Sequence, residues 1–478
     1  MPEDRKKYYI TTPIYYVNDK PHIGSAYPTI AADVLARLHR QLGEDVFFQT
    51  GTDEHGAKIA QAAEAVGKKP KEFADEISAK FAFAWDQLGI APDKFIRTTD
   101  PEHEQAVEKF LNKLKASGKL YEGEYEGLYC VGHEAFIKEA ELVNGVCPDH
   151  KTKPQHLKEK NWFFKLFEYQ KVLEEKINND EFVIRPQTRK NEVLSFIRAG
   201  LEDIAISRPN VKWGIPLPWD KKQTVYVWIE ALFNYCSGIG YGADEAQFQR
   251  FWPADIHLVG KDLTRFHCII WPALLLAIEE KIPLKVYAHG FFTINGEKIS
   301  KSLGNVIDPN DWVAKYGADA VRYFLLREVP FGQDGDVSEE KLKARYNGDL
   351  ANGLGNLFSR VTDMIEKYLK GDIGEFIKSP KDLSEASEAF YNLDFSEGLV
   401  AVWKEIAWAN QLIDKSKPWE LVKTEPEKVK ELLLNLAALL YDIAKKLAPI
   451  LPETAQQIKQ VLESGDIKKS PPLFQKIS

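Results

Sequence analysis

The sequence predicts an α/β protein in which a Rossmann-like parallel sheet is split by an insertion and followed by an all-α helical bundle. A strand–loop–helix–strand pattern runs over residues 8–50 and is typical of the βαβ units that build parallel sheets. Between residues 118 and 225, glycines, short aromatic strands and a Cys/His cluster replace that pattern. From about residue 348 the patterns are almost wholly amphipathic and helical, which indicates a bundle.

The first βαβ unit begins with residues 8–17, whose β-branched and aromatic side chains predict a strand. A loop containing Pro21 follows. Apolar residues then recur at helical spacing until Gly43 ends the predicted helix; they are Ile30, Val34, Leu35 and Leu38. Residues 45–50 predict a second strand, which leads into a polar segment at 51–56. Because such strands run parallel, we expect ligands at their carboxyl ends.

The parallel pattern returns after the insertion. Short strands are predicted at 224–228, 255–259 and 284–288, each next to a helical segment. The longest apolar run, residues 269–278, contains Pro272 and is too short to span a bilayer, so it predicts a buried helix. The sheet is therefore expected to have two halves, one on each side of the insertion.

Two apolar stripes predict long helices near the C-terminal end. The first stripe is followed by Gly371 as a stop and comprises Leu357, Val361, Ile365 and Leu369. The second is ended by Pro449 and Pro452 and comprises Val429, Leu432, Leu433, Leu436, Leu440, Ile443 and Leu447. Several amphipathic helices in succession predict that their apolar faces pack together.

Composition limits the class of protein. A chain of 478 residues predicts two to four domains, and 44% hydrophobic with 28% charged residues is ordinary for chains that bury large cores. The net charge of −8 means that a nucleic acid would have to be held by local basic patches. Residues 1–17 lack the apolar core of a signal peptide. Four cysteines are too few for a disulfide framework, so we expect a cytoplasmic protein.

Two short motifs predict a nucleotide site. Residues 296–302 place Lys298, Ser300, Lys301 and Ser302 in a glycine-flanked segment, which suits a polyphosphate. Far upstream, His22 lies between the first strand and the first helix, where free backbone N–H groups favour anions. Each motif alone is also compatible with an exposed basic turn or a loop histidine. Their order and local context favour a shared function.

Together the two motifs resemble the HIGH and KMSKS signatures of class I aminoacyl-tRNA synthetases. The resemblance implies catalytic roles for His22, Lys298 and Lys301. It implies ATP binding by these three residues and by Gly24, Ser25, Ser300 and Ser302. Ser25 replaces the second histidine of HIGH, so it cannot carry positive charge and is expected chiefly to cap the helix.

Along residues 8 to about 450 the chain resembles methionyl-tRNA synthetases, through Thr12-Pro13-Ile14-Tyr15-Tyr16-Val17-Asn18, residues 51–56, Ile206-Ser207-Arg208, residues 226–232, Gly260-Lys261-Asp262, Phe266-His267 and Lys417-Pro418-Trp419. The family's methionine pocket would comprise Ile14, Tyr16, Asp53, Trp228, Ala231, Leu232, Tyr235, Leu263 and His267. An apolar, aromatic slot suits a thioether, and Tyr16 and His267 could donate hydrogen bonds to its sulfur. Asp53 would bind the substrate ammonium, and Arg208 resembles a conformational partner of the site. Plain core packing is the alternative for Trp228, Leu232 and Leu263.

A zinc knuckle is predicted at about residues 125–155. Cys130 and His133 form one C-x2-H pair, and Cys147 and His150 form another after an interval of thirteen residues. Four such ligands fit a closed, tetrahedral, structural zinc site. The pattern resembles the knuckle in the insertion of some methionyl-tRNA synthetases, although His133 stands where a cysteine is commoner. Two hairpins without metal are the alternative.

The helical end resembles the family's anticodon-binding bundle. Asn356 and Arg360 are one helical turn apart and match positions that read anticodon bases. Trp419 could stack on an unpaired base. The alternatives are a solvated helix charge for Arg360 and a helix anchor for Trp419.

The expected organisation is a catalytic domain at 1–117 and 226–290, an insertion at 118–225, a lysine-loop linker at 291–347 and an anticodon-binding bundle at 348–478. The implied reaction joins L-methionine to ATP with Mg²⁺, giving methionyl-adenylate and pyrophosphate, and then transfers methionine to tRNA(Met). We expect a monomer with no membrane partner. The alternatives are a class I synthetase for another apolar amino acid, or a non-catalytic tRNA-binding or regulatory relative.

Overall fold

The computed structural model describes residues 5–130, 135–137, 139–148, 151–299, 304–374 and 385–477, with positions 125, 135, 136 and 298 described by their backbone. The chain forms two units, each built from three segments. The first unit comprises Met1–Pro21, Gly43–Phe83 and Pro92–His289, and the second comprises His22–Leu42, Ala84–Ala91 and Gly290–Ser478. The predicted α/β fold with a helical C-terminal region is confirmed.

A six-stranded sheet of parallel strands forms the centre of the first unit, in the order β3-β2-β1-β12-β13-β7. Its strands are β1 (Lys7–Tyr16), β2 (Asp45–Asp53), β3 (Lys94–Arg97), β7 (Val183–Arg185), β12 (Ile256–Gly260) and β13 (Lys285–His289). The strands predicted at 8–17, 45–50, 255–259 and 284–288 are confirmed. The strand order reverses between β1 and β12, and ligands of such sheets bind outside the carboxyl ends of the strands at this switch point.

Helices and a continuous apolar core surround this sheet within the first unit. They are α2 (Ala57–Ala65), α4 (Pro101–Ala116), α5 (Gln170–Asn178), α6 (Gln187–Arg198), α7 (Val227–Leu232), α8 (Asn234–Ser237), α9 (Glu245–Phe251) and α10 (Trp271–Ala277), with α3 (Pro70–Gln87) passing from the first unit into the second. A π-helical turn over Phe266–Ile270 runs into α10, whose first turn contains Pro272. The predicted buried helix at 269–278 is confirmed.

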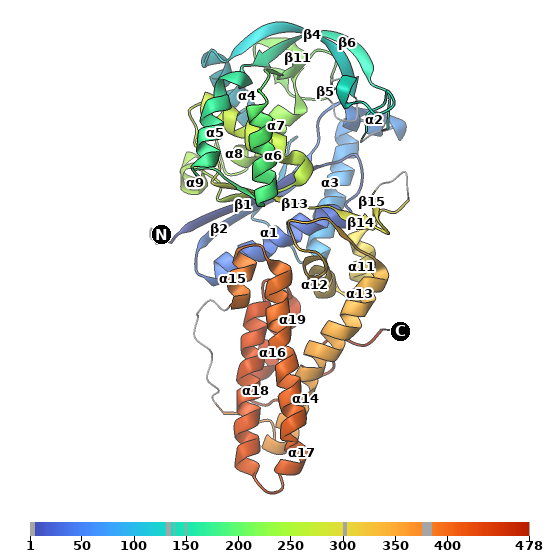
Figure 1. The fold of residues 1–478 in the computed structure, drawn as a ribbon, viewed down its shortest axis with the longest axis vertical. Helices are drawn as coiled ribbons and strands as arrows, with labels where there is room; N and C mark the ends of the chain where they lie inside the picture. Colours follow the sequence, from blue (N-terminus) through green and yellow to red (C-terminus); the bar gives the residue numbers. More distant parts are fainter. Residues whose placement is uncertain are drawn as a thin grey trace. The chain divides into compact units, whose positions relative to one another are not determined.

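Two smaller antiparallel sheets account for the change of pattern after residue 118. One has the order β5-β4-β6-β8, from Ala135–Ile137, Leu120–Cys130, Gln155–Phe164 and Ile204–Ala205. The other has the order β10-β11-β9, from Pro216–Leu217, Asp220–Val225 and Ser207–Arg208. Figure 1 shows β4 and β6 as a long, curved pair. Strand β7 lies between these segments in sequence but pairs with β13 in the parallel sheet.

The strand predicted at 224–228 is wrong in its extent and its sheet. Strand β11 ends at Val225, where it pairs antiparallel with Ser207 of β9. Tyr226 is then the N-cap of helix α7. The segment from Tyr226 to Leu232 is apolar at almost every position, and periodicity cannot distinguish a strand from a helix in so short an apolar run.

The second unit begins with helix α1 (Ile23–Gln41), which Leu42 ends before Gly43 turns the chain at a φ of +83°. A three-stranded sheet follows, in the order β15-β14-β16, from Glu297–Lys298, Phe292–Ile294 and Gly335–Asp336. Asn295 and Gly296 both have positive φ and turn the chain between β14 and β15. The segment that carries Lys298 is therefore a hairpin at its start rather than an open loop.

The rest of the second unit is largely helical, which was predicted from about residue 348 onward. Its helices are α11 (Pro309–Tyr316), α12 (Ala318–Glu328), α13 (Glu339–Arg345), a π-helical segment (Tyr346–Gly355), α14 (Asn356–Leu369), α15 (Glu385–Tyr391), α16 (Phe395–Ser416), α17 (Pro418–Leu421), α18 (Pro426–Leu447) and α19 (Pro452–Leu462). Helices α14, α16 and α18 pack side by side (Figure 1). The two predicted stripes face this core, with Leu369 and Leu432 only partly buried.

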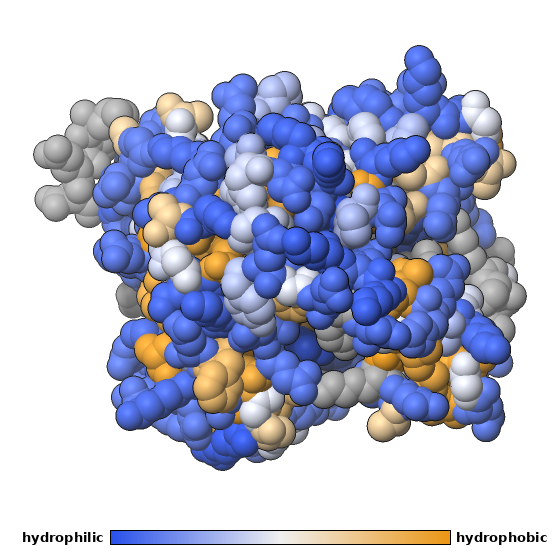
Figure 2. Space-filling model, turned by 90° about the horizontal axis from the view of Figure 1, so that it is seen from above, coloured by the Kyte–Doolittle hydropathy of each residue, from blue (hydrophilic) through white to orange (hydrophobic). Residues whose placement is uncertain are grey.

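Hydrophilic residues cover most of the face shown in Figure 2, and hydrophobic residues appear there in separate groups. None of the helices within the described ranges combines the length and the apolar character needed to cross a membrane.

Candidate active site

The start of helix α1 is organised by His22. His22 is the N-cap residue, with extended backbone angles, and its Nδ1 accepts a hydrogen bond of 3.0 Å from the backbone N–H of Gly24. Ser25 completes a capping box, because its Oγ accepts from the His22 N–H at 3.1 Å. Burial lowers the pKa of His22 below its ordinary value of 6.5. The ring is therefore neutral near pH 7, and its proton sits on Nε2, where it can be donated to a ligand.

Gly24 is required by the position of the His22 ring. A Cβ atom at residue 24 would lie 2.8 Å from His22 Cε1 and 2.9 Å from Nδ1, closer than van der Waals contact allows. Ser25 was predicted to act as the helix cap, but it occupies the third helical position and supports the His22 cap instead. Ser25 stands where the family motif has its second histidine, and its hydroxyl fits the capping box at the start of helix α1.

The two predicted nucleotide motifs lie in the same unit and meet through the backbone. The N–H of Ile23 donates a hydrogen bond of 3.1 Å to the carbonyl of Ile307, a few residues beyond the lysine motif. The Tyr27 ring lies 4.3 Å from the ring of Phe292 at the base of the hairpin. The predicted residues Ser300, Lys301 and Ser302 lie outside the described residues, and Lys298 is described only by its backbone in β15.

All the residues predicted to bind methionine line one cavity in the first unit. They come from the ends of β1 and β2, from α7 and α8, and from the segment after β12, and they are Ile14, Tyr16, Asp53, Trp228, Ala231, Leu232, Tyr235, Leu263 and His267. Pro13 and Asn234 complete the lining. This cavity, the first cavity hereafter, lies at the carboxyl ends of the strands beside the β1–β12 switch point, where such folds bind ligands.

Aromatic rings fix the walls of the first cavity. The rings of Tyr16 and Trp228 meet edge to face at 5.9 Å, and Phe266 stacks on Trp228 at 4.1 Å. Lys58, from the first turn of α2, lies 5.5 Å from the Tyr16 ring. The carboxylate of Asp53 is only 2% exposed at the end of β2. The cavity thus combines an apolar slot with one buried acidic group, which suits an apolar amino acid with a free ammonium.

A chain of hydrogen bonds orients Tyr235 and His267 at this cavity. His267 Nδ1 lies 3.0 Å from the Leu263 carbonyl, so it must donate, and Nε2 then accepts from the Tyr235 hydroxyl at 2.7 Å. Burial lowers the pKa of His267 to about 4, so the ring stays neutral. Both ring nitrogens are engaged in this arrangement, and the predicted hydrogen bond from His267 to a sulfur stays a prediction. The ring can also contact a ligand through its face.

Behind the first cavity lies a buried network that the sequence analysis missed. The Glu230 carboxylate, 1% exposed, contacts His55 Nδ1 at 2.9 Å and His103 Nε2 at 3.0 Å. Burial alone would raise the Glu230 pKa, but His55 and His103 outweigh it and lower the pKa below 4.5. The sequence held one sign of this network: Glu230 is a charged residue inside the apolar segment that forms α7. Such a carboxylate, once buried, is almost always paired.

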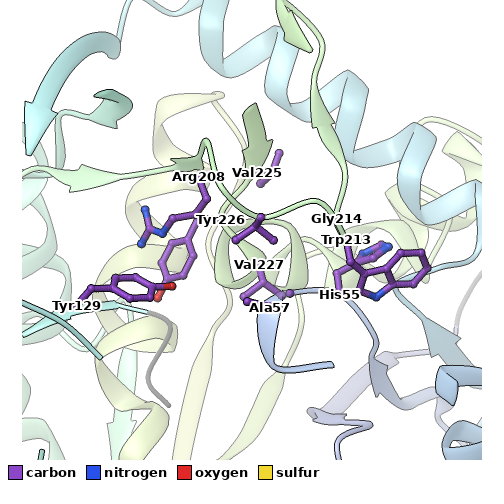
Figure 3. Close-up of a pocket in the computed structure, with 11 residues that line it drawn as sticks. His55, Ala57, Tyr129, Arg208, Trp213, Gly214, Val225, Tyr226 and Val227 are labelled. Carbon is purple, nitrogen blue, oxygen red and sulfur yellow. The ribbon is translucent and has the colours of Figure 1, made fainter. Parts of the chain in front are cut away.

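Arg208 does not line the first cavity. It is 5% exposed, and its guanidinium lies 4.1 Å from the Tyr226 ring and 5.9 Å from the Tyr129 ring. Together with His55 and Trp213, these residues line a second cavity in the same unit (Figure 3). The predicted role of Arg208 as a conformational partner of the site stays a prediction.

The two predicted cysteine ligands are buried at turns of the insertion. Cys130 ends β4, where it pairs with Ala135 of β5. The Cys147 N–H donates to the Thr152 carbonyl, and the Lys151 N–H donates back to the Cys147 carbonyl, which closes a tight turn. His133 and His150 lie outside the described residues. Within the described part of the chain, no three potential ligands are grouped, so the zinc site stays a prediction.

Asn356 and Arg360 share a face of helix α14, as predicted. Both contact the Asn410 side chain of α16, at 3.0 Å and 3.4 Å, and Arg360 also pairs with Asp414. Trp419, in the short helix α17, is 43% exposed. Asn356 and Trp419 are thus exposed and Arg360 is partly exposed on the helical bundle, and their role in anticodon binding stays a prediction.

Comparisons with known proteins agree with this arrangement. A family profile described as tRNA synthetases class I (M) matches residues 8–156 and 149–362. The methionine–tRNA ligase of Thermotoga maritima is 43% identical, over 98% of this chain and 80% of that protein. The methionine–tRNA ligase of Caldanaerobacter subterraneus subsp. tengcongensis is 46% identical, over 96% of this chain and 74% of that protein.

Solved structures give the same result. The Mycobacterium tuberculosis methionyl-tRNA synthetase in complex with methionyl-adenylate has a TM-score of 0.89, with 37% identity over 99% of both chains. The free-state structure of the Mycobacterium tuberculosis enzyme has a TM-score of 0.85, with 32% identity over 100% of this chain and 99% of that one. The parallel sheet, the His22 motif and the family profile define a class I tRNA synthetase. The chain belongs to the methionyl-tRNA synthetase family.

Proposed function

We propose that this chain is a methionine–tRNA ligase that activates L-methionine with ATP and then esterifies tRNA(Met). One observation carries the proposal most strongly: side chains from five separate segments converge on one apolar cavity with a buried carboxylate at the switch point of the sheet. In this assignment the Asp53 carboxylate holds the substrate ammonium, and the rings of Tyr16, Trp228 and Tyr235 enclose the thioether side chain.

In the first step a carboxylate oxygen of methionine attacks the α-phosphorus of ATP. The bond from that phosphorus to the bridging oxygen of the β-phosphate breaks, and pyrophosphate leaves. The methionine carboxylate is already ionised at pH 7, so the step needs no general base. His22 acts as a neutral donor through Nε2, and Lys298 and Lys301 neutralise charge on the leaving phosphates. Gly24, Ser25, Ser300 and Ser302 complete the ATP site, and Mg²⁺ bound with ATP supplies further charge neutralisation.

In the second step a ribose hydroxyl of the terminal adenosine attacks the carbonyl carbon of methionyl-adenylate. The carbon–oxygen bond to the phosphate breaks, AMP leaves with the electron pair of that bond, and the hydroxyl proton passes to the leaving phosphate or to water. The ester therefore forms without any further consumption of ATP. The chain's part in this step is positioning, because an intramolecular-like geometry can supply several kcal/mol of the barrier reduction, roughly 7–11 kcal/mol at best.

We also propose one structural zinc ion in the insertion, held by Cys130, His133, Cys147 and His150. Both cysteines are buried; Cys130 ends a strand that pairs with β5, and the Cys147 carbonyl accepts a hydrogen bond from the Lys151 N–H. Thiolate and imidazole ligands suit tetrahedral zinc. The expected metal content is about one zinc per chain, measured by emission spectroscopy, and Cys147→Ser should lower it together with the thermal midpoint.

The remaining domain roles follow from the same assignment. Asn356, Arg360 and Trp419 bind the anticodon in the domain at 348–478, and the lysine-loop domain at 291–347 connects it to the catalytic domain. Arg208 couples the insertion at 118–225 to the site. The partners are methionine, ATP and tRNA(Met), and the protein acts as a cytoplasmic monomer, which fits the buried thiols of Cys236 and Cys268.

The deciding experiment is ATP–pyrophosphate exchange with each of the twenty amino acids in the absence of tRNA. Exchange that depends on methionine alone is the expected result. Exchange with another apolar amino acid would assign a different class I synthetase. No exchange with any amino acid would favour the non-catalytic relative. In the active protein, Lys301→Ala should abolish most exchange while tRNA binding stays, and unchanged exchange would remove Lys301 from the site.

A further inference from the structure

Glu54 follows Asp53 directly, at the point where β2 ends, and its side chain is fully buried. Successive side chains along a strand point to opposite faces of the sheet. Asp53 lines the first cavity, whereas the Glu54 carboxylate accepts a hydrogen bond of 2.7 Å from the hydroxyl of Thr52, on the other face. Neither step of the proposed reaction uses this carboxylate. A buried carboxylate destabilises a fold unless it is paired and hydrogen-bonded.

Arg97, the last residue of β3, supplies the charge that Glu54 requires. Its Nε donates to Oε1 of Glu54 at 2.7 Å and its Nη2 donates to Oε2 at 2.9 Å, which is the bidentate geometry of a strong pair. The Thr99 hydroxyl also donates to Oε2. Counted among the described residues, the Glu54 carboxylate thus receives four hydrogen bonds, two on each oxygen. Its orientation is therefore fixed.

The backbone at Asp53 is held from both neighbouring strands. On the side of β1, the Val17 N–H donates to the Asp53 carbonyl at 3.2 Å. On the side of β3, the Glu54 N–H donates to the Thr98 hydroxyl at 2.9 Å, and the Thr98 N–H donates to the Thr52 carbonyl at 3.2 Å. The residues before and after Asp53 are thus both tied to the segment that follows β3.

A close approach of β2 and β3 brings Arg97 within reach of Glu54. A Cβ atom at Gly51 would lie 1.9 Å from the Ile96 carbonyl oxygen, so only glycine fits at this position. The register of the two strands places Thr52 opposite Arg97. The guanidinium therefore lies at the carboxyl end of the sheet, beside the residue that follows Asp53.

The network extends from the buried end of β2 to the surface. Arg97 also pairs with Asp75 of α3, and Asp75 pairs with Lys71. The Glu54 side chain is fully buried, Arg97 is 25% exposed and Asp75 is 45% exposed. Exposed ion pairs contribute little, whereas a buried bidentate pair constrains the geometry of its partners. The Glu54–Arg97 pair is therefore the part of the network that bears on Asp53.

We propose that Glu54 and Arg97 are positioning residues for amino-acid recognition, which hold the end of β2 so that the Asp53 carboxylate meets the ammonium group of methionine. This inference rests on the proposed function and adds to it the residues that set the direction of Asp53. The alternative is a pair that only stabilises the sheet. A stabilising pair affects all ligands alike, whereas a positioning pair affects the ligands that carry an ammonium group.

The test uses the full chain and two ligands that differ only in the amino group. L-Methionine carries the ammonium, and 4-(methylthio)butanoate is the same molecule without it. Calorimetry measures the Kd for methionine, and displacement of methionine measures the Kd for the analogue. Arg97→Met should raise the Kd for methionine about tenfold, the equivalent of one misaligned charge-assisted hydrogen bond. The Kd for the analogue and the KM for ATP in pyrophosphate exchange should stay unchanged.

Two further variants separate positioning from folding. Arg97→Lys keeps a cation beside Glu54 but loses the bidentate geometry, so its Kd for methionine should lie between those of the wild type and Arg97→Met. Lys94→Met, on the same strand, removes an exposed partner of Glu102 and should change neither constant. The thermal midpoint of each variant shows whether it is folded at the temperature of the assay.

The pattern across the two ligands decides the outcome. Weakening of methionine alone in Arg97→Lys and in folded Arg97→Met supports the inference. Equal weakening of both ligands, or no weakening of either, overturns it and leaves the proposed function in place, provided that the wild type exchanges pyrophosphate with methionine. Absence of methionine-dependent exchange in the wild type removes the proposed function, and this inference with it.

Discussion

The Nδ1 atom of His55 lies 2.9 Å from a carboxylate oxygen of Glu230, at a point where both side chains are almost wholly buried. His55 follows β2 and lines the second cavity, while Glu230 belongs to α7, which supplies Trp228, Ala231 and Leu232 to the first cavity. The pair therefore joins the two segments that both cavities share. A change in its charge should affect stability and both cavities together.

Stability should depend on pH through this pair. Burial alone would lower the pKa of His55, but Glu230, with Glu104 and Glu54, raises it above 6.5. A raised histidine pKa contributes stability that is fully present below pH 6.5 and is lost as the pH rises through the folded-state pKa. The lowered pKa of Glu230 contributes stability above pH 4.5 that is lost as the pH falls. We expect the thermal midpoint to decline as the pH rises above about 6.5.

Glu230→Gln should remove most of that decline and cost about 1–3 kcal/mol near pH 6. The amide keeps the size of the side chain but not the charge that holds the proton on His55. Thermal unfolding of both proteins between pH 5 and pH 9 measures the difference. Glu245→Gln, which removes an exposed partner of Lys109, is the control and should shift the midpoint little. An equal pH dependence in Glu230→Gln and in the wild type would contradict the assignment.

The hydroxyl of Tyr235 should contribute to methionine affinity. Tyr235→Phe leaves His267 Nε2 as a buried acceptor without its donor, which costs about 1–3 kcal/mol. We expect the KM for methionine to rise about tenfold and the KM for ATP to stay unchanged in pyrophosphate exchange. Tyr441→Phe removes a hydroxyl bonded to Glu463 in the bundle and should change neither constant. Equal effects of the two substitutions would show that Tyr235 acts only through stability.

Gly24→Ala should impair catalysis without unfolding the protein. The added Cβ would force the His22 ring away, so that its Nδ1 loses the hydrogen bond from Gly24 and its Nε2 proton points elsewhere. Misplacement by about 1 Å can lower a rate about 100-fold. Methionine-dependent exchange measures this loss. Gly348→Ala is a matched control, since a Cβ there meets nothing within 4 Å. Full activity in Gly24→Ala would mean that the ring tolerates a second position.

Arg360→Ala should lower aminoacylation of tRNA(Met) and spare methionine activation. Arg360 and Asn356 are aligned by Asn410, and a lost base contact costs about 1–3 kcal/mol, or roughly 10–100-fold in kcat/KM for tRNA. Lys367→Ala, on the same helix, should change kcat/KM much less. An equal loss in both variants would indicate general charge attraction, and parallel loss of pyrophosphate exchange would indicate damage to the fold.

The sequence predicted the parts of the fold that have a local signal. Strands β1, β2, β12 and β13 combine β-branched or aromatic runs with turn residues, so their positions could be read directly. Strand β7 could not, because it has three residues and joins the sheet only through its pairing with β13. Nothing in a short segment indicates which distant strand it will pair with. The helix at 227–232 was missed for a related reason, since a short apolar run is compatible with either structure.

The site was predictable where resemblance supplied the residues. Every predicted methionine contact lines the first cavity, although composition and spacing alone would not have selected Leu263 or Ala231. The hydrogen-bond partners of the residues in and around the cavity could not be predicted. The Tyr235–His267 bond, and its consequence for the proton on His267, depends on the approach of α8 to the turn after β12. Likewise Glu230 finds His55 and His103 only through tertiary packing.

The second unit offers a test of how a buried ion pair stabilises the fold. The Arg322 guanidinium of α12 and the Asp33 carboxylate of α1 are both fully buried, 2.7 Å apart. Arg322 also donates to the carbonyls of Leu88, Pro449 and Ile450, so it joins α1, the end of α3 and the turn after α18. Arg37 shares the Asp33 carboxylate at 2.7 Å.

Arg322→Met should therefore destabilise the protein by about 3–5 kcal/mol, because it removes one of the two cationic partners of the buried Asp33 carboxylate and leaves three carbonyls without this donor. Adding Asp33→Asn should cost less than the sum of the two single changes, since it removes the buried charge that Arg322→Met leaves with Arg37 as its one remaining cationic partner among the described residues. Urea unfolding measures all three variants. Lys315→Met, which breaks an exposed pair with Glu339, should cost less than about 1 kcal/mol. If Arg322→Met proved as mild as Lys315→Met, apolar packing rather than the ion pair would hold these helices together.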